Sequence, residues 1–164
     1  MKLNLETAKL KDISRVAKEC RAMVTTRAWA SAGASIVPIP GADVAADIGM
    51  LMQLLPAITN RFSLDESDLN GLPSETKAVV AKALADVATK FIGKTLTEEV
   101  VVSMLKRFST RLATIEVAKF IPVLGSAAAA TISFTMMKLI GNQHINECEK
   151  AITAIIKYRD SKGA

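Results

Sequence analysis

Apolar residues recur at helical spacing along most of the 164-residue chain, and this pattern limits what the chain can fold into. In the first long stretch, residues 5–33, apolar side chains return every three or four positions while charged residues occupy the other face. No segment alternates apolar and polar residues between turn signals, as a half-buried strand would. The sequence therefore predicts an all-α fold, a single helical bundle of about six helices that forms one domain over residues 1–164.

Prolines, glycines and polar clusters set the expected helix boundaries. We expect helices at about 5–33, 43–62, 74–92, from Thr97 to Pro122, from Gly125 to about 140, and at about 143–159. Pro56 should kink or shorten the second helix, because it lacks a backbone N–H. The polar stretch 63–73 predicts a turn region with one helical turn after Asp65.

Two short segments suggest an internal duplication. Residues 37–42 (VPIPGA) align without gaps with residues 121–126 (IPVLGS), and each follows one amphipathic helix and precedes an apolar one. We therefore expect two related three-helix halves, at about 1–92 and 95–160. The residues expected to form the two hairpin turns are Pro38, Pro40, Gly41, Pro122 and Gly125.

The formal net charge of +5 raises the question of an anionic partner. Nucleic-acid binders usually cluster basic side chains with stacking aromatics, whereas the seven aromatic residues here do not interleave with a basic run. We therefore expect no nucleic-acid partner. One group, Lys106, Arg107 and Arg111, lies on the polar face of an amphipathic helix, where it is either a basic contact face or a solvated face with ion pairs.

Catalytic and metal-binding patterns are weak throughout. The only histidine, His144, is expected to cap a helix or lie on the surface, and Asp43 and Asp47 lack a His or Cys beside them. We expect Asp47 to pair with a buried basic residue. Cys20 and Cys148 fit neither a metal spacing nor a disulfide framework, so we expect buried reduced thiols. The sequence predicts no enzyme, cofactor or metal site.

Two apolar stretches approach the length of a membrane span. Residues 120–137 are uncharged but contain Pro122 and Gly125, and the earlier stretch is interrupted by Asp43 and Asp47. We expect neither to cross a membrane. The start of the chain lacks the apolar core of a signal peptide, and free thiols suit a reducing compartment, so we expect a cytoplasmic chain, peripheral at most to the inner face of a membrane.

Three segments carry a family resemblance. They are 36–41 (IVPIPG) with Asp47 and Leu51, 62–69 (FSLDESDL), and 121–126 (IPVLGS) with Ser133 and Phe134. In this order they resemble the C-terminal helical domain of dynamin-like immunity-related GTPases and related bacterial membrane-associated helical domains. The resemblance implies a helical domain concerned with membrane targeting or self-assembly. The GTPase part has no counterpart, because no GxxxxGK[ST] phosphate loop is present.

Three functions follow as expectations. The first is a non-enzymatic helical module that associates with an anionic membrane surface or docks to a membrane-bound protein partner. The second is a soluble protein-interaction or oligomerisation domain, for which the chain would form a homo-oligomer. The third is a small ligand-binding bundle that uses Asp43, Asp47 and His144.

Overall fold

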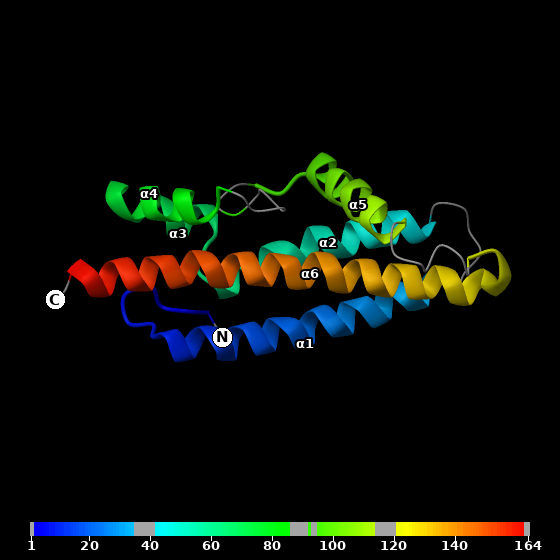
Figure 1. The fold of residues 1–164 in the computed structure, drawn as a ribbon, viewed down its shortest axis with the longest axis horizontal. Helices are drawn as coiled ribbons and strands as arrows, with labels where there is room; N and C mark the ends of the chain where they lie inside the picture. Colours follow the sequence, from blue (N-terminus) through cyan, green and yellow to red (C-terminus); the bar gives the residue numbers. More distant parts are fainter. Residues whose placement is uncertain (1, 35–41, 86–91, 93–94, 114–120, 163–164) are drawn as a thin grey trace. The chain divides into compact units, whose positions relative to one another are not determined.

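The computed structural model describes residues 2–34, 42–85, 92, 95–113 and 121–162, with side chains described except at 42–43, 111–113 and 121–129. These residues form an all-helical structure without a strand, as the sequence predicts. In chain order the helices are α1 (Leu10–Ala34), α2 (Ala42–Arg61), α3 (Glu66–Asn70), α4 (Ser74–Ala83), α5 (Glu98–Ala113) and α6 (Ile121–Lys162) (Figure 1).

The last helix, α6, is continuous over 42 residues, whereas the sequence analysis predicted two helices separated near Gly141. That prediction was wrong because glycine keeps its backbone N–H and costs a helix interior only about 1 kcal/mol, which tertiary packing can outweigh. The helix also begins at Ile121 rather than at Gly125. Pro122 then lies in the first turn, where the N–H that proline lacks has no helical acceptor.

Three other boundaries differ from the predicted ones. Helix α1 begins at Leu10 rather than at residue 5, and α4 ends at Ala83 rather than at about 92, with 86–91 outside the described residues. Helix α2 continues past Pro56 to Arg61, so this proline does not shorten it.

The predicted helical turn after Asp65 is present as α3, and Asp65 is its N-cap. One carboxylate oxygen of Asp65 accepts from the Asp68 backbone N–H at 2.9 Å and from the Ser67 hydroxyl at 2.8 Å, and the other accepts from the Asn60 amide at 2.7 Å. These hydrogen bonds, the backbone one most of all, hold the pKa of Asp65 below its ordinary value. Asp65 therefore fixes the turn between α2 and α3 as an ionised cap.

The chain forms two compact units, one drawn from three separate segments and the other from two. Unit 1 comprises Met1–Arg21, Leu55–Thr95 and Gln143–Ala164, and unit 2 comprises Ala22–Leu54 and Leu96–Asn142 joined through the helices that the units share. The units do not coincide with the predicted repeat halves at 1–92 and 95–160, because each unit takes residues from both. The duplication itself, and the single domain, stay predictions.

The core of unit 1 is aliphatic and is supplied mainly by α1, α2 and α6. Five apolar residues that recur at helical spacing in the last part of α6, from Ile145 to Ile156, are all buried. The principal buried residues are Ile13, Val16, Ala17, Cys20, Leu55, Ile58, Phe62, Leu64, Ile145, Cys148, Ile152, Ile155 and Ile156. Leu10, which was expected in the stripe of the first helix, is instead 52% exposed at the first turn of α1.

The segment that precedes α1 is held within unit 1 by Arg159 and by backbone contacts of Leu3. The Arg159 guanidinium donates to the carbonyl oxygens of Leu5, Glu6 and Ala8 at 3.0, 2.9 and 2.9 Å. The Leu3 N–H donates to the Arg61 carbonyl at 2.9 Å. The planar fork of arginine suits such a multiple contact, whereas lysine would offer a point charge.

The core of unit 2 uses smaller residues on α1 and a clean amphipathic face on α5. Its principal buried residues are Val24, Ala28, Ala32, Leu51, Leu54, Val101, Met104, Phe108, Met136, Met137 and Ile140. Helix α2 is rich in apolar residues, yet Val44 is 53% exposed and Gly49 is also exposed. Only one side of α2 is therefore packed.

Candidate functional site

An exposed tryptophan packed on a half-buried phenylalanine is the most unusual surface feature of the described residues. Trp29, on α1 in unit 2, is 67% exposed although it is a large apolar side chain. Its ring centroid lies 4.7 Å from that of Phe134 on α6, with the two planes tilted by 53°. The tilted contact is a favourable aromatic arrangement, and it leaves most of the indole surface exposed to water.

Neighbouring contacts join the same two helices within unit 2. One turn before Trp29, the Thr25 hydroxyl accepts a hydrogen bond at 2.8 Å from Lys138, which lies one turn after Phe134. Gly141 lies against the buried Val24, where the absence of a side chain lets the helices approach. The two helices therefore run antiparallel here, and the aromatic pair is one of several regular contacts between them.

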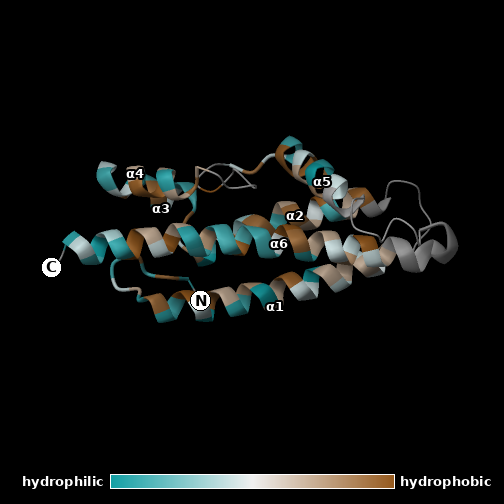
Figure 2. Cartoon of the chain, viewed as in Figure 1, coloured by the Kyte–Doolittle hydropathy of each residue, from teal (hydrophilic) through white to brown (hydrophobic). Residues whose placement is uncertain are grey.

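The segments that carry this pair are almost without charge. Residues 22–34 of α1 contain one charged residue, Arg27, and residues 121–142 of α6 contain one, Lys138. The remainder of α1 and α6, in unit 1, is densely charged, and hydropathy colouring follows this division along α6 from residue 130 onward (Figure 2). Three of the four large apolar side chains found exposed, Trp29, Val44 and Leu139, belong to unit 2. Within unit 2, the segments of α1 and α6 that carry the aromatic pair are therefore nearly uncharged, and each presents an exposed apolar side chain.

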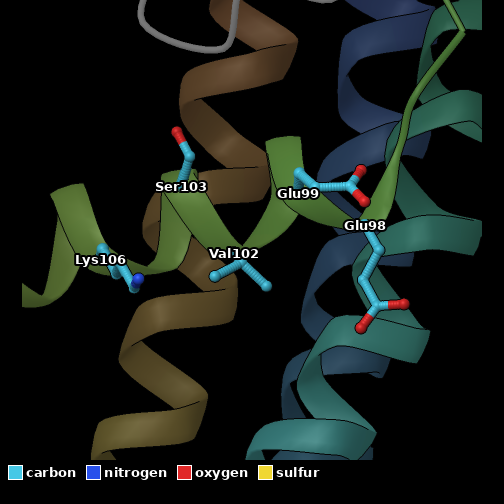
Figure 3. A pocket seen from close by; sticks show the side chains of 5 residues that line it. All are labelled: Glu98, Glu99, Val102, Ser103 and Lys106. Carbon is cyan, nitrogen blue, oxygen red and sulfur yellow. The ribbon is translucent and has the colours of Figure 1, made fainter.

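The predicted basic contact face lies on α5. Lys106 and Arg107 are exposed there, and the Arg111 side chain is outside the described residues. Lys106 lines a surface pocket together with Glu98, Glu99, Val102 and Ser103, all on α5, with the two carboxylates at one end of the pocket (Figure 3). Positive and negative groups thus share this face, so it does not present a purely basic surface.

The predicted hairpin-turn residues receive only a partial description. Pro38, Pro40 and Gly41 lie outside the described residues. Pro122 and Gly125 lie in the first two turns of α6, whose backbone alone is described there. Their role as turn residues stays a prediction.

The only histidine lies in the core rather than at a helix end or on the surface. His144 is fully buried within α6, so the sequence prediction was wrong, because a continuous α6 places it on the core side next to Ile145 and Cys148. Its Nε2 lies 2.8 Å from the Thr59 hydroxyl oxygen and 3.6 Å from the Cys148 sulfur. The Thr59 hydroxyl also donates to the Leu55 carbonyl at 3.1 Å. This cluster satisfies buried polar groups.

The protonation states of the cluster do not favour nucleophilic chemistry. Burial lowers the pKa of His144 to about 3, so the imidazole is neutral at physiological pH. Burial also raises the pKa of the Cys20 thiol to about 11 and that of Cys148 well above its ordinary value. Thiols with raised pKa are poor nucleophiles. Both cysteines are free and buried, as predicted.

The residues of the predicted ligand-binding bundle do not gather in one unit. Asp47 lies in unit 2, where the Ser31 hydroxyl donates to its carboxylate, whereas His144 lies in unit 1. The Asp43 side chain is outside the described residues. Over the part of the chain with described side chains, no three His, Cys, Asp or Glu residues are arranged to hold a metal ion.

Comparisons with known proteins add no relative. The chain matches no protein-family model, no curated protein and no solved structure. Among the described helices, none is both long enough and apolar enough to cross a membrane. No known relative identifies a site in this chain, so the choice of the aromatic pair as the candidate site depends on its geometry alone. Sequence reasoning overlooked it, although the only tryptophan of the chain, in a helical segment with a single charged residue, was a visible signal.

Proposed function

We propose that this chain is a non-enzymatic helical module that associates with a membrane surface through unit 2. The observation that carries the proposal is the exposed Trp29 ring, packed on the half-buried Phe134, on helix segments with almost no charge. Indole prefers the membrane interface, because its ring is apolar while its N–H remains hydrogen-bonded there. The resemblance to helical domains of membrane-associated GTPases implies the same role.

The size of the expected contribution follows from the exposed area. An aromatic side chain of roughly 200 Å² that is about two-thirds exposed presents about 130 Å² to water. At about 25 cal/mol per Å², complete removal of this surface from water contributes about 3 kcal/mol. Partial burial in an interface gives about half of that, which corresponds to roughly a tenfold change in partitioning.

Trp29 also makes the proposal easy to test, because it is the only tryptophan in the chain. Titration with lipid vesicles should shift its emission to shorter wavelength as the indole leaves water. Vesicle flotation at low salt should move the protein to the top fraction. Protein that stays in the bottom fraction with every lipid composition, with unchanged emission, would refute the proposal.

A matched variant distinguishes binding through the aromatic pair from non-specific adsorption of exposed apolar side chains. Trp29→Ala should weaken vesicle binding about tenfold. Leu10→Ala removes another exposed apolar side chain from the same helix, but in unit 1, and should leave binding unchanged. Equal effects of the two substitutions would show that unit 2 is not the contact.

The competing function is self-association through the same surface. Small exposed residues, Ala22, Thr26 and Ala30, lie on α1 near Trp29 and would let a second helix approach. Light scattering distinguishes the two functions: a stable oligomer that Trp29→Ala dissociates, with no vesicle binding, would favour self-association.

A further inference from the structure

The charged residues around the aromatic pair are both basic. Within residues 22–34 and 121–142, Arg27 and Lys138 are the only charged residues, and no Asp or Glu is present. Lys138 follows Phe134 by one turn of α6 and contacts Thr25, one turn from Trp29 on α1. Arg27 is half-buried and two residues from Trp29, so it lies about 200° around α1 from the indole, at the other edge of the exposed face of this helix. The aromatic surface is thus accompanied only by positive charge along these two helices.

We propose that unit 2 binds a bilayer that contains anionic phospholipid, and that two basic residues contact lipid phosphate groups: Lys138 beside the Trp29–Phe134 pair, and Arg27 at the other edge of the exposed face of α1. This inference rests on the proposed membrane association and names its lipid class. An ammonium has three N–H donors, and Thr25 accepts from one of them. Basic side chains next to interfacial aromatics anchor proteins in the headgroup region.

The surface fits a bilayer better than an acidic protein. The flanking residues on α1 are small and carry few side-chain hydrogen-bond donors or acceptors, as in Ala22, Ala30 and Gly33. A folded acidic partner needs matched polar groups for specificity, whereas a bilayer offers phosphate above an apolar layer. Basic residues with long side chains and an aromatic pair, on a surface with few other polar groups, match the bilayer, where phosphate lies above an apolar layer.

The acidic groups of unit 2 argue against the α5 face as the lipid contact. Asp47 is buried and bonded to Ser31, so it does not add charge to the surface. Glu98 and Glu99 are exposed at the start of α5, on the helix that carries Lys106 and Arg107. Their carboxylates would repel anionic lipid. The basic residues of α5 therefore provide a control with the same change in charge.

The experiment measures binding of the full chain to two kinds of vesicle by Trp29 emission and by flotation. One kind is pure phosphatidylcholine, and the other is an equimolar mixture of phosphatidylcholine and phosphatidylglycerol. The wild type should bind the anionic vesicles more tightly, and high salt should remove most of the difference. Equal binding to both kinds would overturn this inference and leave the proposed function intact, whereas binding to neither would refute both.

Substitutions then assign the contact. Arg27→Gln with Lys138→Gln should weaken binding to anionic vesicles roughly 25-fold, since each cation contributes about fivefold, or about 1 kcal/mol. Lys106→Gln with Arg107→Gln should weaken it less than about twofold. A larger loss in the second pair would overturn the assignment.

Lys138→Arg keeps the positive charge and is the control for loss of binding that is caused by misfolding. It should bind as the wild type does, with unchanged helical circular dichroism. Loss of binding in this variant while helicity is retained would contradict a role for the positive charge at this position.

Discussion

Gly141 is the point where a single added methyl group should disturb the packing of unit 2. A Cβ at this position would lie 2.7 Å from both methyl carbons of Val24 and 3.3 Å from its Cβ. Val24 is fully buried, so its side chain has little freedom to move aside. Gly141→Ala should therefore force α1 and α6 apart or push Val24 into its neighbours.

The expected magnitude is the difference between two opposing effects. An extra methyl group in a packed core costs about 1–3 kcal/mol. Alanine in place of glycine in a helix interior gains about 1 kcal/mol. The net loss in the free energy of unfolding should then lie between about 0 and 2 kcal/mol.

Gly49 supplies the matched control, because it lies inside α2 and a Cβ there would meet nothing within 4 Å. Gly49→Ala should stabilise the protein by up to about 1 kcal/mol through helix propensity alone. The difference between the two variants, about 1–3 kcal/mol, isolates the clash at Gly141 from the backbone effect.

A compensating change tests the cause directly. Val24→Ala alone should cost about 2 kcal/mol or more, from two lost methyl groups and the cavity that they leave. Combined with Gly141→Ala, the new methyl group occupies the vacated space, so the double variant should be more stable than the sum of the single effects by about 1 kcal/mol or more.

Urea unfolding followed by circular dichroism provides all four free energies. Strict additivity of Val24→Ala and Gly141→Ala, or a Gly141→Ala variant as stable as Gly49→Ala, would refute the close approach of the two helices at Gly141.

Three further predictions concern unit 1. His144 has a folded-state pKa of about 3, below its unfolded value near 6.5, so the unfolded state takes up the proton first and stability falls as the pH falls from 6.5 toward 3. Between pH 7 and pH 5 the loss should be about 2 kcal/mol, and His144→Leu should remove this dependence in pH-resolved urea titrations. Asp65→Ala removes the cap of α3 and should cost about 1 kcal/mol, whereas Glu6→Ala at an exposed position before α1 should cost nearly nothing; equal losses would contradict the capping role. Arg159→Lys should raise amide hydrogen exchange of Leu3 roughly tenfold, because a lysine cannot bond three carbonyls of the preceding segment; unchanged protection would show that another contact holds it.

The helical class was predictable because periodicity depends on neighbouring residues alone. The stripe that ends in Ile155 and Ile156 lies in the core as expected, and the cap at Asp65 follows from its local sequence. The break predicted near Gly141 failed for a tertiary reason. From the sequence alone, Gly141 suggests the end of a helix. The structure shows instead that it lies within α6, where it lets Val24 approach closely.

The candidate site was less predictable, because exposure depends on how helices pack. Leu10 and Trp29 both looked like parts of one long amphipathic helix, and His144 looked like a surface residue among polar neighbours. Only the three-dimensional arrangement places His144 beside Thr59, which is 85 positions away in the sequence, and leaves Trp29 in water against Phe134.

The position of Trp29 also determines which measurements of folding will be informative. Water already reaches most of this indole in the folded state, so unfolding should change its emission wavelength only slightly. Unit 1 contains no tryptophan among its residues and is invisible to this signal. A Trp29→Phe, Phe62→Trp variant would place the indole in the fully buried core of unit 1 and make its unfolding visible. The same exposure that makes Trp29 a sensitive reporter of a lipid surface makes it a nearly silent reporter of folding.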